Sequence, residues 1–304
     1  MSGGAAARQA HSLEQIEHRP WPLPARRWTL GQTWEDVLFA HWRVPLEDVR
    51  AHVPDALEVE LYDGSAWLGI TPFRVTGLRA RGMLPLPGLS SFLELDVRTY
   101  VRAADGKPGV WFLGIDASSR LVAELSRRLA RLPYTHARMS LERYDGWIEV
   151  ECARVGNNRG RVFSGRYRGD GEVFHAVPGS LEWFLAERYC LYTTDARGAL
   201  LRAESHHGPW ALQRAEAELE LTTIAPLELS GTISPPKGHV ILDVYPVGRT
   251  HGKPVKSKRV AASGGQFSTE ITVLGPGSYV LVARNTAGPV NGAGASTPVP
   301  VTIA

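Results

Sequence analysis

Lysine is nearly absent from the first three quarters of this chain. Of the 304 residues, positions 1–228 contain a single lysine, Lys107, within the sequence DGKPG at positions 105–109. This composition predicts an exposed turn, and an exposed lysine keeps an ordinary, protonated amine. Because only the free amine is nucleophilic, we expect no lysine in this part of the chain to form a Schiff base with a substrate.

Cysteine and long apolar runs are also scarce. The two cysteines, Cys152 and Cys190, lack the spacing of a metal site. We predict buried free thiols in a reducing cytoplasm, with a disulfide as the alternative. No run approaches the roughly 18 apolar residues needed to cross a bilayer. Gly-rich phosphate loops are missing as well. We therefore expect a cytoplasmic protein with no metal, no cofactor, and neither nucleic acid nor membrane as a partner; a homo-oligomer is left open.

Charge divides the chain into two parts. Residues 229–304 carry seven lysines and arginines against two acids, a net charge of +5, whereas residues 1–228 carry −2. The later part has six short predicted strands separated by Gly and Pro, a pattern typical of an immunoglobulin-like β-sandwich. We predict a flexible leader at 1–25, a first domain at 26–228 and the sandwich at 229–304. Adhesion, dimerisation and spacing are all open roles for the sandwich.

The stretch from Phe92 to Val101 alternates in residue type. Aromatic and charged residues occupy every second position: Phe92, Glu94, Asp96, Arg98 and Tyr100. The residues between them are aliphatic apart from Thr99, so the period is two and predicts a strand with unlike faces. The polar face is either solvated, on a surface sheet, or turned into the lumen of a barrel.

Turn formers at regular intervals predict a mainly antiparallel β fold with few helices. One helix is expected from Leu121 to Leu132, because its leucines recur at helical spacing and Pro133 ends it. Ser180 is expected to cap a second helix. A Gly-Asp-Gly turn is expected at 169–171.

Five segments carry a resemblance to a known family. FLELDVRTYV, GKPGVWF, LPY, ERYCLYT and HHGPW occur in this order. They resemble the YqjF-like family, a bacterial domain of unknown function that is similar to the acetoacetate decarboxylase superfamily. The resemblance covers roughly residues 26 to 228. It implies a cone-shaped, mostly antiparallel β-barrel with short helices and an internal pocket.

The resemblance also implies candidate site residues. Arg43 and Glu94 stand at the places of an arginine and a glutamate that line the superfamily's pocket. The decarboxylases carry their Schiff-base lysine just after a proline, where this chain has Tyr134. This difference argues against decarboxylation of acetoacetate. Within the YqjF-like segments, Arg188 and His207 are further candidates for the same cavity.

Two functional hypotheses follow from the sequence. In the first, a barrel pocket holds a small carboxylate- or keto-bearing ligand through Arg43, Glu94, Arg98, Tyr134, Arg188 and His207. Any catalysis would be acid/base chemistry, with Glu94 as the candidate and no covalent lysine. In the second, the polar residues are ion pairs that merely fill the lumen, His207 is hydrogen-bonded near a Gly-Pro turn, and the β-sandwich mediates structural contacts.

Overall fold

The computed structural model describes residues 5–155, 160–221, 227–232, 238–246, 256–262, 266–271, 277–285, 294–295 and 299–303. Contacts between residues divide the chain into two compact units. The first unit comprises Met1–Arg159 and Gly165–Glu218, and the second comprises Gly160–Ser164 and Leu219–Ala304. The boundary expected at 228/229 stays a prediction.

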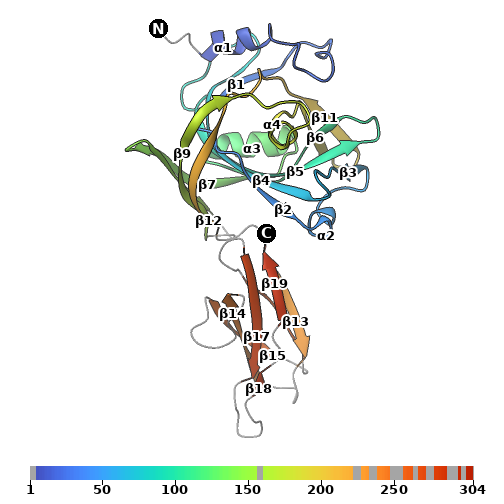
Figure 1. Cartoon of the computed structure of the whole chain (residues 1–304), viewed down its shortest axis with the longest axis vertical. Coiled ribbons are helices and arrows are strands. Elements are labelled where there is room, and N and C mark those ends of the chain that lie inside the picture. Colours follow the sequence, from blue (N-terminus) through green and yellow to red (C-terminus); the bar gives the residue numbers. More distant parts are fainter. Residues whose placement is uncertain are drawn as a thin grey trace. The chain divides into compact units, whose positions relative to one another are not determined.

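A twelve-stranded sheet forms the main body of the structure (Figure 1). Its strands are β1 (Leu30–Glu35), β2 (Ala40–Val44), β3 (Leu57–Val59), β4 (Ala66–Ala80), β5 (Phe92–Ala103), β6 (Pro108–Ala117), β7 (Tyr134–Tyr144), β8 (Trp147–Arg154), β9 (Gly160–Phe174), β10 (Cys190–Thr194), β11 (Leu200–Glu204) and β12 (Leu212–Leu221). The main path runs β1-β4-β5-β6-β7-β8-β9-β12. Off this path, β2 pairs with β4, β3 pairs with β5, and the β10–β11 hairpin joins β6 through β10.

The sheet is not closed, so the expected closed barrel is wrong. The strands at the two ends of the path, β1 and β12, are not hydrogen-bonded to each other within the described residues. Most pairs are antiparallel, as expected, but β6 runs parallel to β7 and to β10. A parallel neighbour needs a crossover connection, and a helix between β6 and β7 provides one.

Within the described ranges, four short helices accompany the sheet: α1 (Ala5–Ser12), α2 (Leu46–Arg50), α3 (Arg120–Leu129) and α4 (Leu181–Ala186). The cap expected at Ser180 is confirmed, since its side chain accepts a hydrogen bond from the backbone N–H three residues later, and Ser119 caps α3 in the same way.

The leucines whose spacing predicted α3 do not face the sheet. Its leucines are exposed (Leu121 49%, Leu125 44% and Leu129 81%), whereas the buried side chains are Val122 and Ala123. These two small side chains pack in one cluster with Phe73 and Phe92. The helix therefore lies close to the sheet on its small-residue side, which turns its leucines outward.

Two local expectations also differ from the structure. Residues 5–12 form a helix, and Arg19 of the expected leader is buried and donates to the carbonyl of Ser205 at 2.7 Å. The expected turn at 169–171 lies inside the long strand β9, where Gly171 takes a positive φ and its carbonyl accepts from Gln213. The side-chain amide of Gln213 lies over Gly169, at the place a Cβ would occupy, so glycine there serves close packing.

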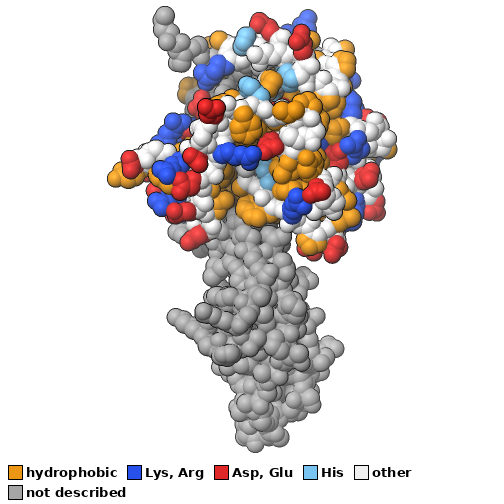
Figure 2. Space-filling model, viewed as in Figure 1, with side chains coloured by type: hydrophobic (Ala, Val, Ile, Leu, Met, Phe, Trp, Pro, Cys, Tyr) orange, Lys and Arg blue, Asp and Glu red, His pale blue; other side chains and the backbone are white. Residues whose placement is uncertain are grey.

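Both cysteines are free and buried, as expected. No described helix is long and apolar enough to span a membrane. Acidic and basic side chains are interspersed on the visible face of the described part (Figure 2).

The later strands form two small sheets. They are β13 (Leu227–Thr232), β14 (Gly238–Pro246), β15 (Lys256–Ala262), β16 (Gln266–Ile271), β17 (Gly277–Asn285), β18 (Gly294–Ala295) and β19 (Val299–Ile303). One sheet pairs β13 with β16, and the other has the order β15-β14-β17-β18, with β19 also on β17. The short strands are confirmed. The immunoglobulin-like assignment stays a prediction, and the side chains of the expected core lie outside the described residues.

Candidate functional site

Strand β5 carries a row of ionisable side chains into the interior of the first unit. Glu94, Asp96 and Arg98 are 6%, 1% and 5% exposed. They alternate with Leu95 and Val97, which are buried on the opposite face. Because β4 and β6 pair along both edges of β5, the strand is enclosed on all sides. The solvated-face alternative is therefore wrong, and the polar face is internal.

Glu94 is held by Tyr134, at the start of β7. The Tyr134 hydroxyl donates to Glu94 Oε2 at 3.1 Å. Burial, reinforced by the neighbouring Asp96 carboxylate, raises the pKa of Glu94 to about 8, although the bond from Tyr134 opposes that rise. Glu94 is therefore a protonated acid at neutral pH, and it can donate a hydrogen bond or a proton.

Asp96 and Arg98 form a loose buried pair. The Arg98 Nη1 atom lies 3.7 Å from Asp96 Oδ2. Burial raises the pKa of Asp96 to about 6, opposed by Arg98 and by the nearby Thr71 hydroxyl, so the carboxyl is ionised at pH 7. Neither Asp96 oxygen has a hydrogen-bond partner within the described residues, since the nearby Thr71 hydroxyl is itself without one, and neither has Arg98 Nε. Buried polar atoms without partners are rare in folded proteins, and these three lie on one face of one strand.

A neutral histidine lies two strands away from these charges, across β4. His41 of β2 contacts the Tyr100 hydroxyl through Nε2 at 2.6 Å, while that hydroxyl donates to the carbonyl of Leu185 at 3.0 Å. His41 Nε2 is therefore the donor. Burial and the Arg98 charge lower the pKa of His41 to about 3. Gly69 of β4 lies between His41 and Arg98 in the register of the sheet, and a Cβ on Gly69 would stand only 3.0 Å from the imidazole ring.

Aromatic rings surround the charged row. Arg98 lies over the ring of Phe39, with 5.3 Å from its guanidinium carbon to the ring centroid. Trp210 contacts Phe39 at 5.2 Å between centroids, and its indole N–H has no partner within the described part of the chain. Trp34 stacks on Phe73 at 4.1 Å, across from Glu94. The surroundings of the row are thus apolar, with a few unpaired polar atoms.

Arg188 and His207 are placed at the margin of this cluster. Arg188 lies over the Tyr100 ring at 4.9 Å, but it is bonded to Glu60 and to the carbonyl of Phe184. His207 contacts backbone carbonyls through both ring nitrogens. Nδ1 lies 2.7 Å from the carbonyl oxygen of Gly208, and Nε2 lies 3.3 Å from that of Arg188. Its ring contacts the Trp210 ring, at 5.0 Å between centroids. The hydrogen-bonded histidine of the second hypothesis matches this geometry.

Arg43 does not join the cluster, contrary to expectation. Its side chain is 53% exposed and pairs with Asp63 at 3.1 Å. In β2, Arg43 lies two residues from His41, which would place both on one face of a regular strand. The guanidinium instead lies over the Trp67 ring, 5.2 Å from its centroid, and extends to the Tyr62–Ser65 turn that holds Asp63.

Lys107 lies outside the row formed by Glu94, Asp96 and Arg98, and it forms an ion pair with Glu204. Its Nζ atom lies 2.9 Å from Glu204 Oε1 and 5.1 Å from the centroid of the Trp21 ring.

Sequence reasoning missed three members of the cluster, namely Asp96, Thr71 and His41. Asp96 was detectable, because it lies between Glu94 and Arg98 in the same alternating pattern. The other two come from β4 and β2, and only the strand register Thr71↔Asp96 and His41↔Gly69 places them there. No local sequence signal specifies that register.

Residues 31–242 match the family DUF2071, described as an uncharacterized conserved protein (COG2071). The uncharacterized protein YqjF of Bacillus subtilis (strain 168) is 41% identical over 211 residues, which cover 69% of this chain and 86% of YqjF.

Similar solved structures include an acetoacetate decarboxylase from Legionella pneumophila (TM-score 0.42, 10% identity, covering 84% of this chain and 92% of that one). A second acetoacetate decarboxylase has a TM-score of 0.46 at 14% identity, covering 87% and 96%. The enduracididine biosynthesis enzyme MppR complexed with pyruvate has a TM-score of 0.43 at 14% identity, covering 84% and 90%. On the family match and the identity to YqjF, this chain belongs to the DUF2071 family.

Proposed function

We propose that the interior cluster of Glu94, Asp96 and Arg98 binds a small molecule with a carboxylate or keto group. The observation that carries the proposal is the buried Nε of Arg98, a hydrogen-bond donor without a partner among the described residues. A buried polar group without a partner costs about 1–3 kcal/mol. A carboxylate or keto oxygen of a ligand that accepts from Arg98 Nε recovers that free energy on binding.

The protonation states set the ligand's chemistry. At neutral pH the cluster holds a neutral Glu94, an anionic Asp96 and a cationic Arg98. A keto oxygen accepts from the protonated Glu94, and a carboxylate pairs with the guanidinium of Arg98. Because Asp96 competes for the same guanidinium, a carboxylate ligand binds more tightly once Asp96 takes up a proton.

The proposed binding involves no covalent lysine. Tyr134 stands where the resemblance places the reactive amine, and a phenol does not form an imine. Lys107 is paired with Glu204. If the protein catalyses a reaction, Glu94 is the acid/base group, since its pKa of about 8 lets it exchange a proton near neutral pH.

A thermal-shift screen tests the proposal. Pyruvate and acetoacetate each carry both groups, whereas acetate has only the carboxylate and acetone only the ketone. The unfolding midpoint of the wild type is expected to rise with the concentration of either keto acid and less with the fragments. Arg43→Ala is the matched control because Arg43 lies at the surface, and it should respond as the wild type does.

Arg98→Gln removes the proposed guanidinium contact, and its response is measured against its own ligand-free midpoint. The proposal expects the response to be lost in Arg98→Gln and kept in Arg43→Ala. A flat response of the wild type across the panel would favour the second hypothesis, in which the interior charges are structural.

A further inference from the structure

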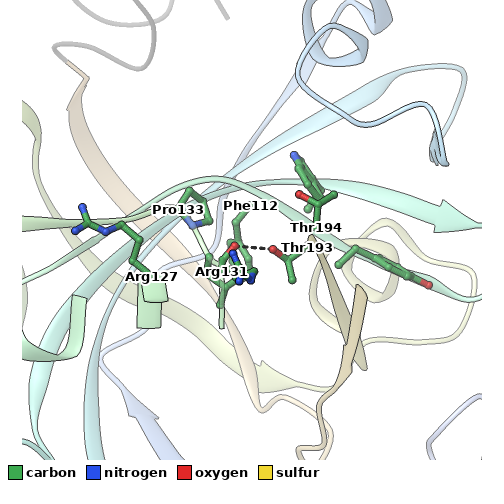
Figure 3. A pocket seen from close by; sticks show the side chains of 9 residues that line it. Phe112, Arg127, Arg131, Pro133, Thr193 and Thr194 are labelled. Carbon is green, nitrogen blue, oxygen red and sulfur yellow. Dashed lines mark hydrogen bonds between the residues drawn. The ribbon is translucent and has the colours of Figure 1, made fainter. Parts of the chain in front are cut away.

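A notch interrupts the sheet along one edge of β6. On that edge β10 pairs with Val110 and Trp111, and β7 pairs with residues from Ile115 onward. Residues 112–114 lie between these two partners and pair with neither of them. A cavity of about 290 Å³ lies at this interruption. Its lining is drawn in Figure 3 and comprises Trp111, Phe112, Arg127, Arg131, Leu132, Pro133, Tyr192, Thr193 and Thr194.

The lining combines rings, hydroxyls and cations and includes no carboxylate. Successive side chains of a strand point to opposite faces, so Trp111 and Phe112 bring one ring from each face of β6 to the notch. The Thr194 hydroxyl makes no hydrogen bond to any described residue, whereas Thr193 donates to the carbonyl of Arg131 at 2.6 Å. An apolar slot with a few polar groups has the composition of a small-molecule site.

Arg131 is the available cation of the notch. Arg127 is bonded to Glu124 and extends away from the other lining residues in Figure 3. Arg131 has no ion-pair partner within the described ranges. Its φ of 53° lies in the left-handed region, which a bulky residue adopts only when its surroundings impose it. The Thr193 bond to its carbonyl, together with the Ile115 N–H donating to Pro133 O at 3.1 Å, fixes the backbone on both sides of Leu132.

We propose that this notch binds a small anion with a flat apolar body, the chemistry of an aromatic carboxylate or an aryl phosphate. The guanidinium of Arg131 pairs with the anionic group, and the Thr194 hydroxyl donates to it. The rings of Trp111 and Phe112 contact the flat body. This site involves none of the residues of the interior cluster, so it does not depend on the function proposed for Glu94, Asp96 and Arg98.

The test is a titration of the full-length protein, followed by ¹H–¹⁵N correlation spectra. Benzoate and phenyl phosphate are the anionic probes, benzamide is the neutral isostere of benzoate, and acetate is an anion without a ring. We expect both aromatic anions to shift the Trp111 indole resonance and the Thr193 and Thr194 amides. Benzamide and acetate should do so at least about tenfold more weakly, because each lacks one of the two contacts.

Two variants complete the test. Arg131→Gly removes the guanidinium and places glycine where φ is positive, so the fold is retained, and benzoate affinity should fall about tenfold. Arg128→Gln is the matched control, because Arg128 lies three residues before Arg131, in the last turn of α3, and does not line the notch. Glu94→Gln should leave the notch shifts unchanged, which separates this site from the interior cluster.

The opposite results overturn the proposal. Equal shifts with benzamide and benzoate would mean that the notch is only an apolar slot. Unchanged benzoate affinity in Arg131→Gly would remove Arg131 from the site. Resonances of the notch that stay fixed while those of the interior move would assign the binding to Glu94, Asp96 and Arg98 instead.

Discussion

The Tyr134 hydroxyl in β7 donates a hydrogen bond to Glu94 Oε2 in β5, at 3.1 Å. A phenol thus contacts the buried carboxyl at the position where the resemblance places an amine. A lysine there would pair with Glu94 and hold it ionised. The phenol leaves burial as the largest influence, so the pKa of Glu94 is raised to about 8.

Tyr134→Phe is expected to destabilise the protein by about 1 kcal/mol at pH 7, because it removes one buried hydrogen bond. The loss should grow above pH 8, where Glu94 ionises and the bond becomes charge-assisted. Chemical denaturation at pH 7 and pH 9 measures the difference. Tyr144→Phe is the matched control, because Tyr144 is 74% exposed. Equal effects of the two substitutions at both pH values would contradict the assigned bond.

Stability should decrease with rising pH because of Glu94. Its pKa is about 8 in the folded chain against 4.5 for the ordinary group, so the folded state holds an extra proton between these values. Within this window each pH unit costs up to about 1.4 kcal/mol of unfolding free energy. The stabilisation is complete below pH 4.5 and lost as pH passes 8. Asp96 acts in the same direction up to its pKa of about 6.

Glu94→Gln isolates this contribution from the buried histidines, whose lowered pKa values act in the opposite direction. The difference in melting temperature between the variant and the wild type should move in favour of the variant from pH 5 to pH 9. Glu142→Gln, at an exposed position, should show a constant difference. A constant difference for Glu94→Gln as well would mean that Glu94 is not protonated in the fold.

The buried pair of Asp96 and Arg98 predicts a strongly non-additive double mutant. Arg98→Gln leaves a buried carboxylate without its cation and should cost about 3–5 kcal/mol. Adding Asp96→Asn removes that charge and should recover on the order of 1–3 kcal/mol. Arg43→Ala, which breaks an exposed pair, should cost less than about 1 kcal/mol. Denaturant midpoints are measured for Arg98→Gln, Asp96→Asn, their double variant and Arg43→Ala, and additive losses at Asp96 and Arg98 would show that the two charges do not interact.

Borohydride reduction tests the absence of a reactive lysine. After incubation with acetoacetate and borohydride, the mass of the intact protein is expected to stay unchanged, because Lys107 is paired with Glu204. A covalent adduct in residues 1–228 would overturn this part of the proposal. Peptide mapping then identifies the modified lysine.

The sequence predicted the local features of this structure, but it did not predict that the sheet is open. Alternation predicted β5 and the shared face of Glu94 and Arg98, since both depend only on a period of two. The caps at Ser119 and Ser180 were predictable because capping is a bond between residues three apart. The open edge between β1 and β12 depends on long-range pairing, which no single segment encodes.

The site was predicted only in part, because its assembly also depends on contacts between segments that are distant in the sequence. Glu94, Arg98 and Tyr134 lie in the cluster, whereas Arg43 is held at the surface by Asp63 and Trp67. The leucines of α3 show a second limit of pattern reasoning. Helical spacing identifies a stripe, but the small side chains of Val122 and Ala123 decided which side meets the sheet.

Calorimetric titration of pyruvate into the wild type and Asp96→Asn at pH 7.5 tests the central claim most directly. If the interior cluster is a ligand site, both proteins bind, and the variant binds about tenfold more tightly, because Arg98 is released from the competing carboxylate. Absence of binding heat in both proteins, with the variant still folded, would contradict the account.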